Sequence, residues 1–197
     1  MSSENTGIIL ETPRLILRQF TECDADNLFN LNSDPEVMRF LTGGQPTPRD
    51  EITDQVIPFH LGVYQRLDRL GTWAAESADD RQFLGWFHYR PAPDGDTTNI
   101  ELGYRLRQAA WNKGYATEGS RALIRMGFTE LPVKRVYAHT MALNTRSRHV
   151  LEKCGLKLVG SIPYNGGFPI EGAELGEVEY ALTKAEWEAG RAADRLG

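Results

Sequence analysis

The chain has few cysteines and no long apolar segment. Its 197 residues include two cysteines, Cys23 and Cys154, which can build neither a disulfide framework nor a cluster of metal ligands. It has no run of about 18 apolar residues, so we expect no segment that spans a membrane. The polar first residues lack the basic and apolar blocks of a signal peptide. We therefore expect a cytoplasmic protein without a membrane partner or a bound metal.

Acidic residues outnumber basic ones, and the net charge of −5 argues against a general nucleic-acid-binding surface. The charges are distributed unevenly along the chain. Residues 101–153 hold ten lysines and arginines against four glutamates, a local charge of +6. Such a segment would suit an anionic ligand, although a solvated helix face explains any single arginine equally well.

The length of the chain suits one domain, which we expect to occupy residues 1–197 with its core at about residues 10–187. Apolar periodicity predicts an α/β fold. The expected strands are 15–20, 72–77, 82–89, 100–106, 135–142, 156–163 and 177–182. The expected helices are 23–31, 49–70 divided near Pro58, 117–129 and 145–154. The long loop at residues 164–176 is expected to line the substrate side of a site.

A glycine turn joins the strand at 100–106 to the helix at 117–129. A tight turn before a helix N-terminus is typical of an anion site, because the first helical N–H groups have no partner and the helix dipole adds positive potential. The sequence therefore predicts that backbone holds a phosphate group here. The residues of the turn are Trp111, Asn112, Lys113, Gly114, Tyr115, Ala116, Thr117 and Glu118.

Two familiar phosphate loops fit this turn badly. A Walker A loop requires lysine after its second glycine, but Ser120 and Arg121 follow Gly119. A dinucleotide-binding loop requires three glycines in the pattern G-x-G-x-x-G, which the turn lacks. A nucleotide-binding module therefore remains a weaker alternative.

The turn instead resembles the pyrophosphate loop of the GNAT N-acetyltransferase superfamily. Trp111 replaces the Gln or Arg of the general loop, as in the ribosomal-protein-alanine acetyltransferase (RimJ/RimL-like) branch, and Asn112 replaces a glycine of that branch. Four further segments resemble the branch in order and spacing. They are Thr-Pro-Arg-Leu-Ile-Leu-Arg at 12–18, Ser-Asp-Pro-Glu-Val-Met at 33–38, Glu-Leu-Gly-Tyr at 101–104, and Asn144-x-x-Ser147 followed by Glu-Lys-Cys-Gly-Leu at 152–156.

The resemblance implies a mixed, seven-stranded central sheet flanked by helices, with splayed fourth and fifth strands at 100–106 and 135–142. It implies acetyl-CoA as cosubstrate, with the pyrophosphate held by residues 111–117. The pantetheine arm would lie along the backbone of Tyr104, Arg105 and Leu106, and Asn144 and Ser147 would complete its site. Asn144 is also a good helix N-cap. Gly103 leaves room for a ligand or merely fits a crowded sheet.

Acyl transfer from a thioester to an amine requires a neutral amine, a stabilised oxyanion and a stabilised leaving thiolate. Glu101 is the candidate base, and its alternative role is an ion pair with an arginine such as Arg105. Ser147 is the candidate on the thiolate side, and its alternative is a hydrogen bond to local backbone. Both residues favour an enzyme over a CoA-binding regulator or inactive relative. His139 is expected to be structural.

The acceptor is expected to be a primary amine, either a protein N-terminus or a small molecule. An α-amine, with a pKa of about 7.8, is on the order of 10% neutral at pH 7, whereas a lysine amine is neutral at only about 0.04%. No strong base is evident in the sequence, so an α-amine is slightly favoured. Members of the branch that the chain resembles are often homodimers, and we therefore expect a homodimer here.

Overall fold

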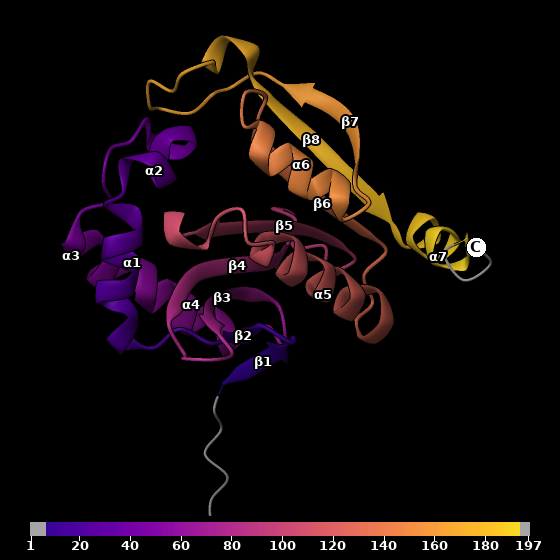
Figure 1. Ribbon diagram of the computed structural model, residues 1–197, viewed down its shortest axis with the longest axis horizontal. Helices are drawn as coiled ribbons and strands as arrows, with labels where there is room; N and C mark the ends of the chain where they lie inside the picture. The colour runs from indigo at the N-terminus through magenta and orange to yellow at the C-terminus, as the bar shows by residue number, and fades with distance from the viewer. Residues whose placement is uncertain (1–6, 194–197) are drawn as a thin grey trace, which may run out of the picture.

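The computed structural model describes residues 7–193, and these form one mixed sheet with helices on both faces (Figure 1). The strand order is β1-β2-β3-β4-β5-β6-β8-β7. The strands are β1 (Ile8–Glu11), β2 (Leu15–Arg18), β3 (Gly71–Ser77), β4 (Phe83–Pro91), β5 (Asn99–Leu106), β6 (Arg135–Met141), β7 (Lys157–Ile162) and β8 (Glu177–Thr183).

The described residues contain eight strands, whereas the resemblance implied seven. The additional strand, β1, pairs antiparallel with β2 through a short turn at residues 12–14. It has only four residues, and they do not alternate between buried and exposed positions, so the periodicity that predicts a strand is missing. The domain was expected to occupy residues 1–197, and residues 1–6 of that range lie outside the described part of the chain.

The main helices are α1 (Ala25–Asn32), α2 (Pro35–Thr42), α4 (Ile57–Tyr64), α5 (Tyr115–Glu130), α6 (Thr145–Lys153) and α7 (Lys184–Ala193). The segment expected to be helical over 49–70 ends at Tyr64 and comprises α3 (Arg49–Glu51), a π-helical turn (Ile52–Val56) and α4. Pro58 lies in the first turn of α4. The helical segment was expected to divide near Pro58, and the π-helical turn just before α4 marks this division. Helices α2 and α7 were not among the expected elements.

The two faces of the sheet pack against different helices. Leu102 and Leu106 of β5 belong to the large core that includes Leu123 and Ile124 of α5. On the opposite face, Ala74 and Phe83 pack with residues of α1, α2 and α4 such as Leu28, Val37 and Ile57. No helix within residues 7–193 is long and apolar enough to cross a membrane.

The parallel pair β5–β6 separates after three residue pairs. Asn99, Ile100 and Glu101 pair with Arg135, Val136 and Tyr137, but β5 continues to Leu106 without this partner. β6 instead remains paired with β8 along its whole length. The expected splay is therefore present, and it leaves one backbone edge of β5 from residue 102 onward without a strand partner.

Candidate functional site

The glycine turn leads directly into the N-terminus of α5. Gly114 is the N-cap residue and has φ 84°, a left-handed conformation that favours glycine, and Asn112 has φ 60°. Within residues 7–193, the N–H groups of Tyr115, Ala116 and Thr117 have no hydrogen-bond acceptor. These three free donors lie at the positive end of a 16-residue helix, which is the backbone arrangement that the predicted anion site requires.

A polar network fixes this turn against the chain between β1 and β2. Glu118, in the first turn of α5, accepts hydrogen bonds from Thr12 Oγ1 at 2.7 Å, from Arg14 N at 3.1 Å and from Arg14 Nε at 2.6 Å. Arg14 Nη1 also donates to the carbonyl of Lys113 at 2.9 Å, and its guanidinium lies over the Tyr115 ring. Two segments about 100 residues apart in sequence therefore form one support for the loop.

We expect Glu118→Gln to destabilise the protein by about 1 kcal/mol or more, because charged hydrogen bonds to Arg14 are weakened. Burial raises the pKa of Glu118, but the bonds from Thr12 and Arg14 outweigh it and hold the pKa below the usual 4.5. The carboxylate therefore contributes stability above pH 4.5, and this contribution is lost as the pH falls through the lowered pKa. Thermal melts of both proteins should differ at pH 7 and converge in strong acid; a constant difference would contradict this role.

Trp111 connects the turn to the end of β5 and to α6. Its indole Nε1 donates to the carbonyl of Leu106 at 2.7 Å. The guanidinium of Arg146, in the first turn of α6, lies 5.3 Å from its ring centroid. The Trp111 side chain thus supports the loop and holds Arg146 near it, which adds positive charge where an anion would bind.

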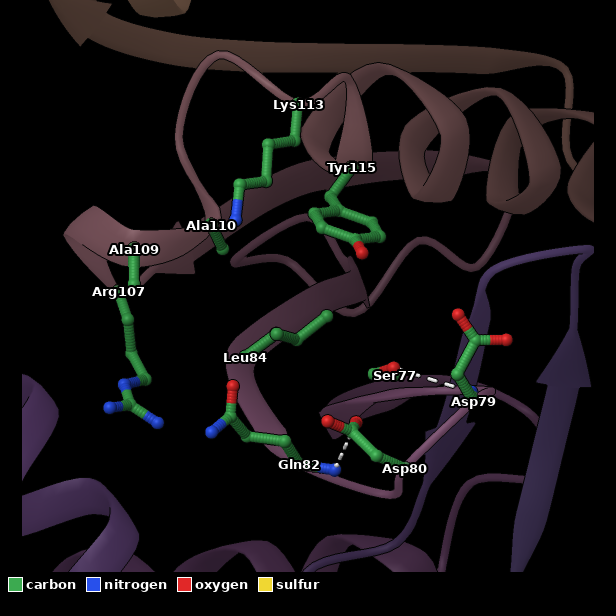
Figure 2. Close-up of a pocket in the computed structure, with 10 residues that line it drawn as sticks. All are labelled: Ser77, Asp79, Asp80, Gln82, Leu84, Arg107, Ala109, Ala110, Lys113 and Tyr115. Atoms are coloured by element: carbon green, nitrogen blue, oxygen red, sulfur yellow. Dashed lines mark hydrogen bonds between the residues drawn. The ribbon is translucent and has the colours of Figure 1, made fainter.

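Lys113 extends from the turn into a pocket of about 240 Å³ (Figure 2). The opposite wall is the turn between β3 and β4, with Asp79 and Asp80. Arg107 also lines the pocket and donates to the carbonyl of Phe83. The pocket carries two charges of each sign, so its charge alone does not select a ligand.

Tyr104, Ser147 and Asn144 lie together where α6 packs against β5. The hydroxyls of Tyr104 and Ser147 are 3.1 Å apart, and Asn144 Oδ1 accepts from the N–H of Ser147 at 3.2 Å. Asn144 is therefore the N-cap of α6, and only its amide nitrogen remains free to donate to a ligand. Burial raises the pKa of Tyr104, so its hydroxyl keeps its proton at neutral pH.

Glu101 faces the other side of the sheet and is paired with Arg90 of β4. Arg90 Nε donates to Glu101 Oε2 at 2.8 Å, and Arg90 Nη2 lies 2.7 Å from the same oxygen. The ion pair expected as an alternative role exists, but its arginine is Arg90 and not Arg105. The second oxygen, Oε1, lies 3.9 Å from Nε2 of His88 and remains available to a ligand.

His88 occupies the space that Gly103 leaves open. The two residues are opposite each other in the β4–β5 pair, and a Cβ on Gly103 would meet the imidazole ring of His88. A larger residue at position 103 would therefore require the imidazole to move. Burial, with the nearby charges of Arg90 and Arg105, lowers the pKa of His88 to about 3, and its buried Nε2 has no partner within residues 7–193.

The side chain of Arg105 does not face the phosphate loop. It extends from the Glu101 side of β5 toward α1, donates to Asn32 Oδ1 and lies over the Trp86 ring. Of the expected pantetheine residues, Arg105 can contribute only its backbone, and the Leu106 carbonyl already accepts from Trp111. Strand alternation placed Arg105 beside Glu101, but sequence could not show which helix covers that face.

Sequence reasoning missed His88, Arg90 and Asn32 on this face, and it missed the support that Arg14 gives to the loop. His88 and Arg90 alternate with buried residues in β4, which was a usable signal. The contact between Asn32 and Arg105 joins residues 73 positions apart, so no local pattern predicts it. His139, expected to be structural, lies 3.3 Å from Glu179 of β8.

The residues present fit a long phosphate-bearing thioester ligand. The three free N–H groups of α5 and the charges of Lys113 and Arg146 suit a pyrophosphate. The unpaired edge of β5 offers backbone groups to an extended amide chain, and the Tyr104–Ser147 hydroxyl pair lies beside that strand.

Comparisons with known proteins agree with this geometry. The model of the acetyltransferase (GNAT) domain matches residues 14–157. An FsC-acetyl coenzyme A-N(2)-transacetylase from Aspergillus fumigatus is 33% identical over 90% of this chain and 77% of its own length. Spermidine N-acetyltransferase from Vibrio cholerae, solved with CoA and spermine, superposes with a TM-score of 0.73 at 18% identity, covering 89% of this chain and 99% of that one.

The ribosomal L7/L12 alpha-N-protein acetyltransferase RimL, solved with coenzyme A, also has a TM-score of 0.73 at 18% identity and covers 89% of this chain and 97% of its own. At this identity the two solved structures establish the fold alone. The family model covers most of the chain, and the Aspergillus fumigatus relative matches nearly all of it. The chain therefore belongs to the GNAT acetyltransferase family and is an N-acetyltransferase that uses acetyl-CoA.

Proposed function

We propose that this enzyme moves an acetyl group to a primary amine by direct attack of the amine on the thioester. The observation that carries the proposal is the arrangement around the splay. Glu101 is the last paired residue of β5 before the splay, and the Tyr104–Ser147 pair lies just beyond it on the opposite face of the sheet. A base on one face and proton donors on the other suit a reaction that removes a proton from nitrogen and delivers one to sulfur.

The assigned roles follow from the contacts. Acetyl-CoA supplies the activated acetyl group, with its phosphates held by residues 111–117 and its amide chain by the β5 edge and the Asn144 amide. Glu101 Oε1 accepts the amine proton, directly or through water, while Arg90 fixes the other oxygen. Tyr104 and Ser147 stabilise or protonate the leaving thiolate. Cys154 takes no part, because burial raises the pKa of its thiol to about 11.

We further place the enzyme in the RimJ/RimL-like branch, in the cytoplasm, as a single domain. The joint support of the loop by Thr12, Arg14 and Glu118 uses residues from two of the resembling segments, which favours the branch. The free state of Cys23 and Cys154 favours a reducing compartment. The branch does not fix the acceptor, and one relative is named for N(2) of FsC whereas another is named for spermidine.

We also propose a homodimer that involves β7. Every residue of β7 is exposed and the strand pairs only with β8 in the described chain. Leu158 and Val159 are 53% and 56% exposed, which is unusual for an unprotected edge strand. Light scattering should give twice the chain mass, and a Val159→Lys variant should give one chain mass; a monomeric wild type would contradict the proposal.

The test of the proposed function is release of free CoA from acetyl-CoA in the presence of a panel of amines, followed by mass spectrometry of the product. We expect an N-acetylated primary amine and no acetylated enzyme intermediate. A Glu179→Ala variant should retain this transfer. Glu179 is a carboxylate on the Glu101 side of the sheet, but it pairs with Arg135 and His139 outside the assigned site. Binding of acetyl-CoA without transfer to any amine would contradict the proposal.

A further inference from the structure

Two arginines of the sheet are largely enclosed, and they differ in how their charge is compensated. Arg18 of β2 has two carboxylate partners: Asp24 at 2.7 and 2.9 Å, and Glu76 through Nε. Hydrogen bonds to Asp24 are the main cause of its raised pKa. Arg105 of β5 has no carboxylate partner within residues 7–193, and burial lowers its pKa to about 10.

The contacts of Arg105 do not neutralise its positive charge. One nitrogen donates to Asn32 at the C-terminal end of α1, where the helix dipole provides about half a negative charge. The guanidinium stacks over Trp86, 5.0 Å from the ring centroid, and Nε is buried without an acceptor. Enclosing a charge without a full partner is costly, so its presence points to a ligand that supplies the partner.

The neighbouring groups do not balance this charge. The charge of Arg90 is matched by Glu101. Burial, with Arg90, lowers the pKa of His60 to about 4, and His88 is likewise neutral at neutral pH. Among residues 7–193, the face of β5 beside the splay therefore carries one unmatched positive charge, and this charge belongs to Arg105.

Two unpaired polar atoms lie on the same face. Within the described residues, five buried side-chain polar atoms have no hydrogen-bond partner, and two of them are His88 Nε2 and Arg105 Nε. His88 stacks on Trp86, which in turn lies under Arg105. A polar ligand at this place would explain both, because native proteins rarely leave such atoms unpaired.

We propose that Arg105 binds a carboxylate of the acceptor, so that the acceptor is a free α-amino acid or a close analogue. The inference rests on the proposed function and narrows its acceptor. Glu101 and Arg105 alternate on one face of β5, with His88 across Gly103 between them. An amine at the Glu101 and His88 end and a carboxylate at the Arg105 end match the charges of an α-amino acid. A peptide N-terminus carries an amide instead of this carboxylate.

The test compares α-amino acids with their own carboxamides as acceptors, using wild type and Arg105→Met. We expect wild type to prefer the free acids by about 100-fold or more in kcat/KM, because a carboxamide leaves the guanidinium unpaired. Arg105→Met should remove this preference by raising KM for the acids, with KM for acetyl-CoA unchanged. Arg105→Lys should show part of the preference for free acids, because lysine keeps the positive charge but lacks the planar guanidinium group that binds a carboxylate through two hydrogen bonds.

Thermal melting separates a ligand-binding role from a structural one. If the role of Arg105 is to bind a ligand, Arg105→Met should melt at or above the wild-type temperature. Arg18→Met should melt several degrees lower, because Asp24 and Glu76 lose their partner. Equal use of acids and carboxamides, or a strongly destabilised Arg105→Met, would overturn the inference. Transfer only to amines without a carboxylate, such as spermidine, would overturn it but leave the proposed function, whereas no transfer to any amine would remove both.

Discussion

Gly114→Asp should abolish binding of acetyl-CoA, with a loss of at least about 100-fold in affinity. Two effects combine at this position. Gly114 has φ 84°, where an L-residue costs roughly 1–2 kcal/mol. The new carboxylate would lie beside the free N–H groups of α5, where it repels the phosphates and competes with them for the same donors. It could also pair with Arg14, whose Nη2 is 3.3 Å from the Cβ position.

Gly114→Ala is the matched control for this result. It introduces the same backbone strain without the charge, so the difference between the two variants isolates the electrostatic effect. We expect alanine to weaken acetyl-CoA binding by about tenfold, in line with 1–2 kcal/mol of strain. Calorimetric titration measures both variants, and a folded Gly114→Asp protein that retained wild-type affinity would defeat the assignment of the loop.

Glu101→Gln should lower kcat by about 100-fold or more while leaving acetyl-CoA affinity nearly unchanged, because a base acts only on the amine proton. The change keeps the shape of the side chain and one oxygen, so Arg90 retains an acceptor. The acid limb of the pH–rate profile should also change. An unchanged kcat and profile would remove Glu101 as the base.

Glu179→Gln is a control for a general charge effect on this sheet face. Glu179 lies on β8, where Arg135 and His139 contact it. Removing its charge should leave kcat near the wild-type value. A loss equal to that of Glu101→Gln would indicate that the net charge of the face, and not proton transfer, causes the effect.

Local sequence signals were sufficient to predict the glycine turn and the helix that follows it. Gly114 and the helix after it form one continuous segment, and the structure places them as the spacing predicted. The splay of β5 and β6 followed from the family resemblance and is also present. These features depend on short-range backbone chemistry or on short motifs that resemble those of the family.

Side-chain contacts between different strands and helices could not be predicted from the sequence. The ion pair of Glu101 was expected along its own strand, but Arg90 on the neighbouring strand makes it. Gly103 gave no sign that His88 fills the space beside it. Arg105 was assigned with the cofactor because its backbone borders the splay, whereas its side chain extends toward α1. In each case the deciding partner comes from a different element, and register and packing select it.

The most direct test of the account is hydrogen exchange of the backbone amides at the start of α5, with and without acetyl-CoA. The N–H groups of Tyr115, Ala116 and Thr117 have no acceptor in the described chain, so they should exchange rapidly in the free protein. Acetyl-CoA should slow them strongly, because phosphate oxygens then accept their hydrogens. Unchanged exchange at these three amides under saturating acetyl-CoA would contradict the placement of the cofactor at this loop.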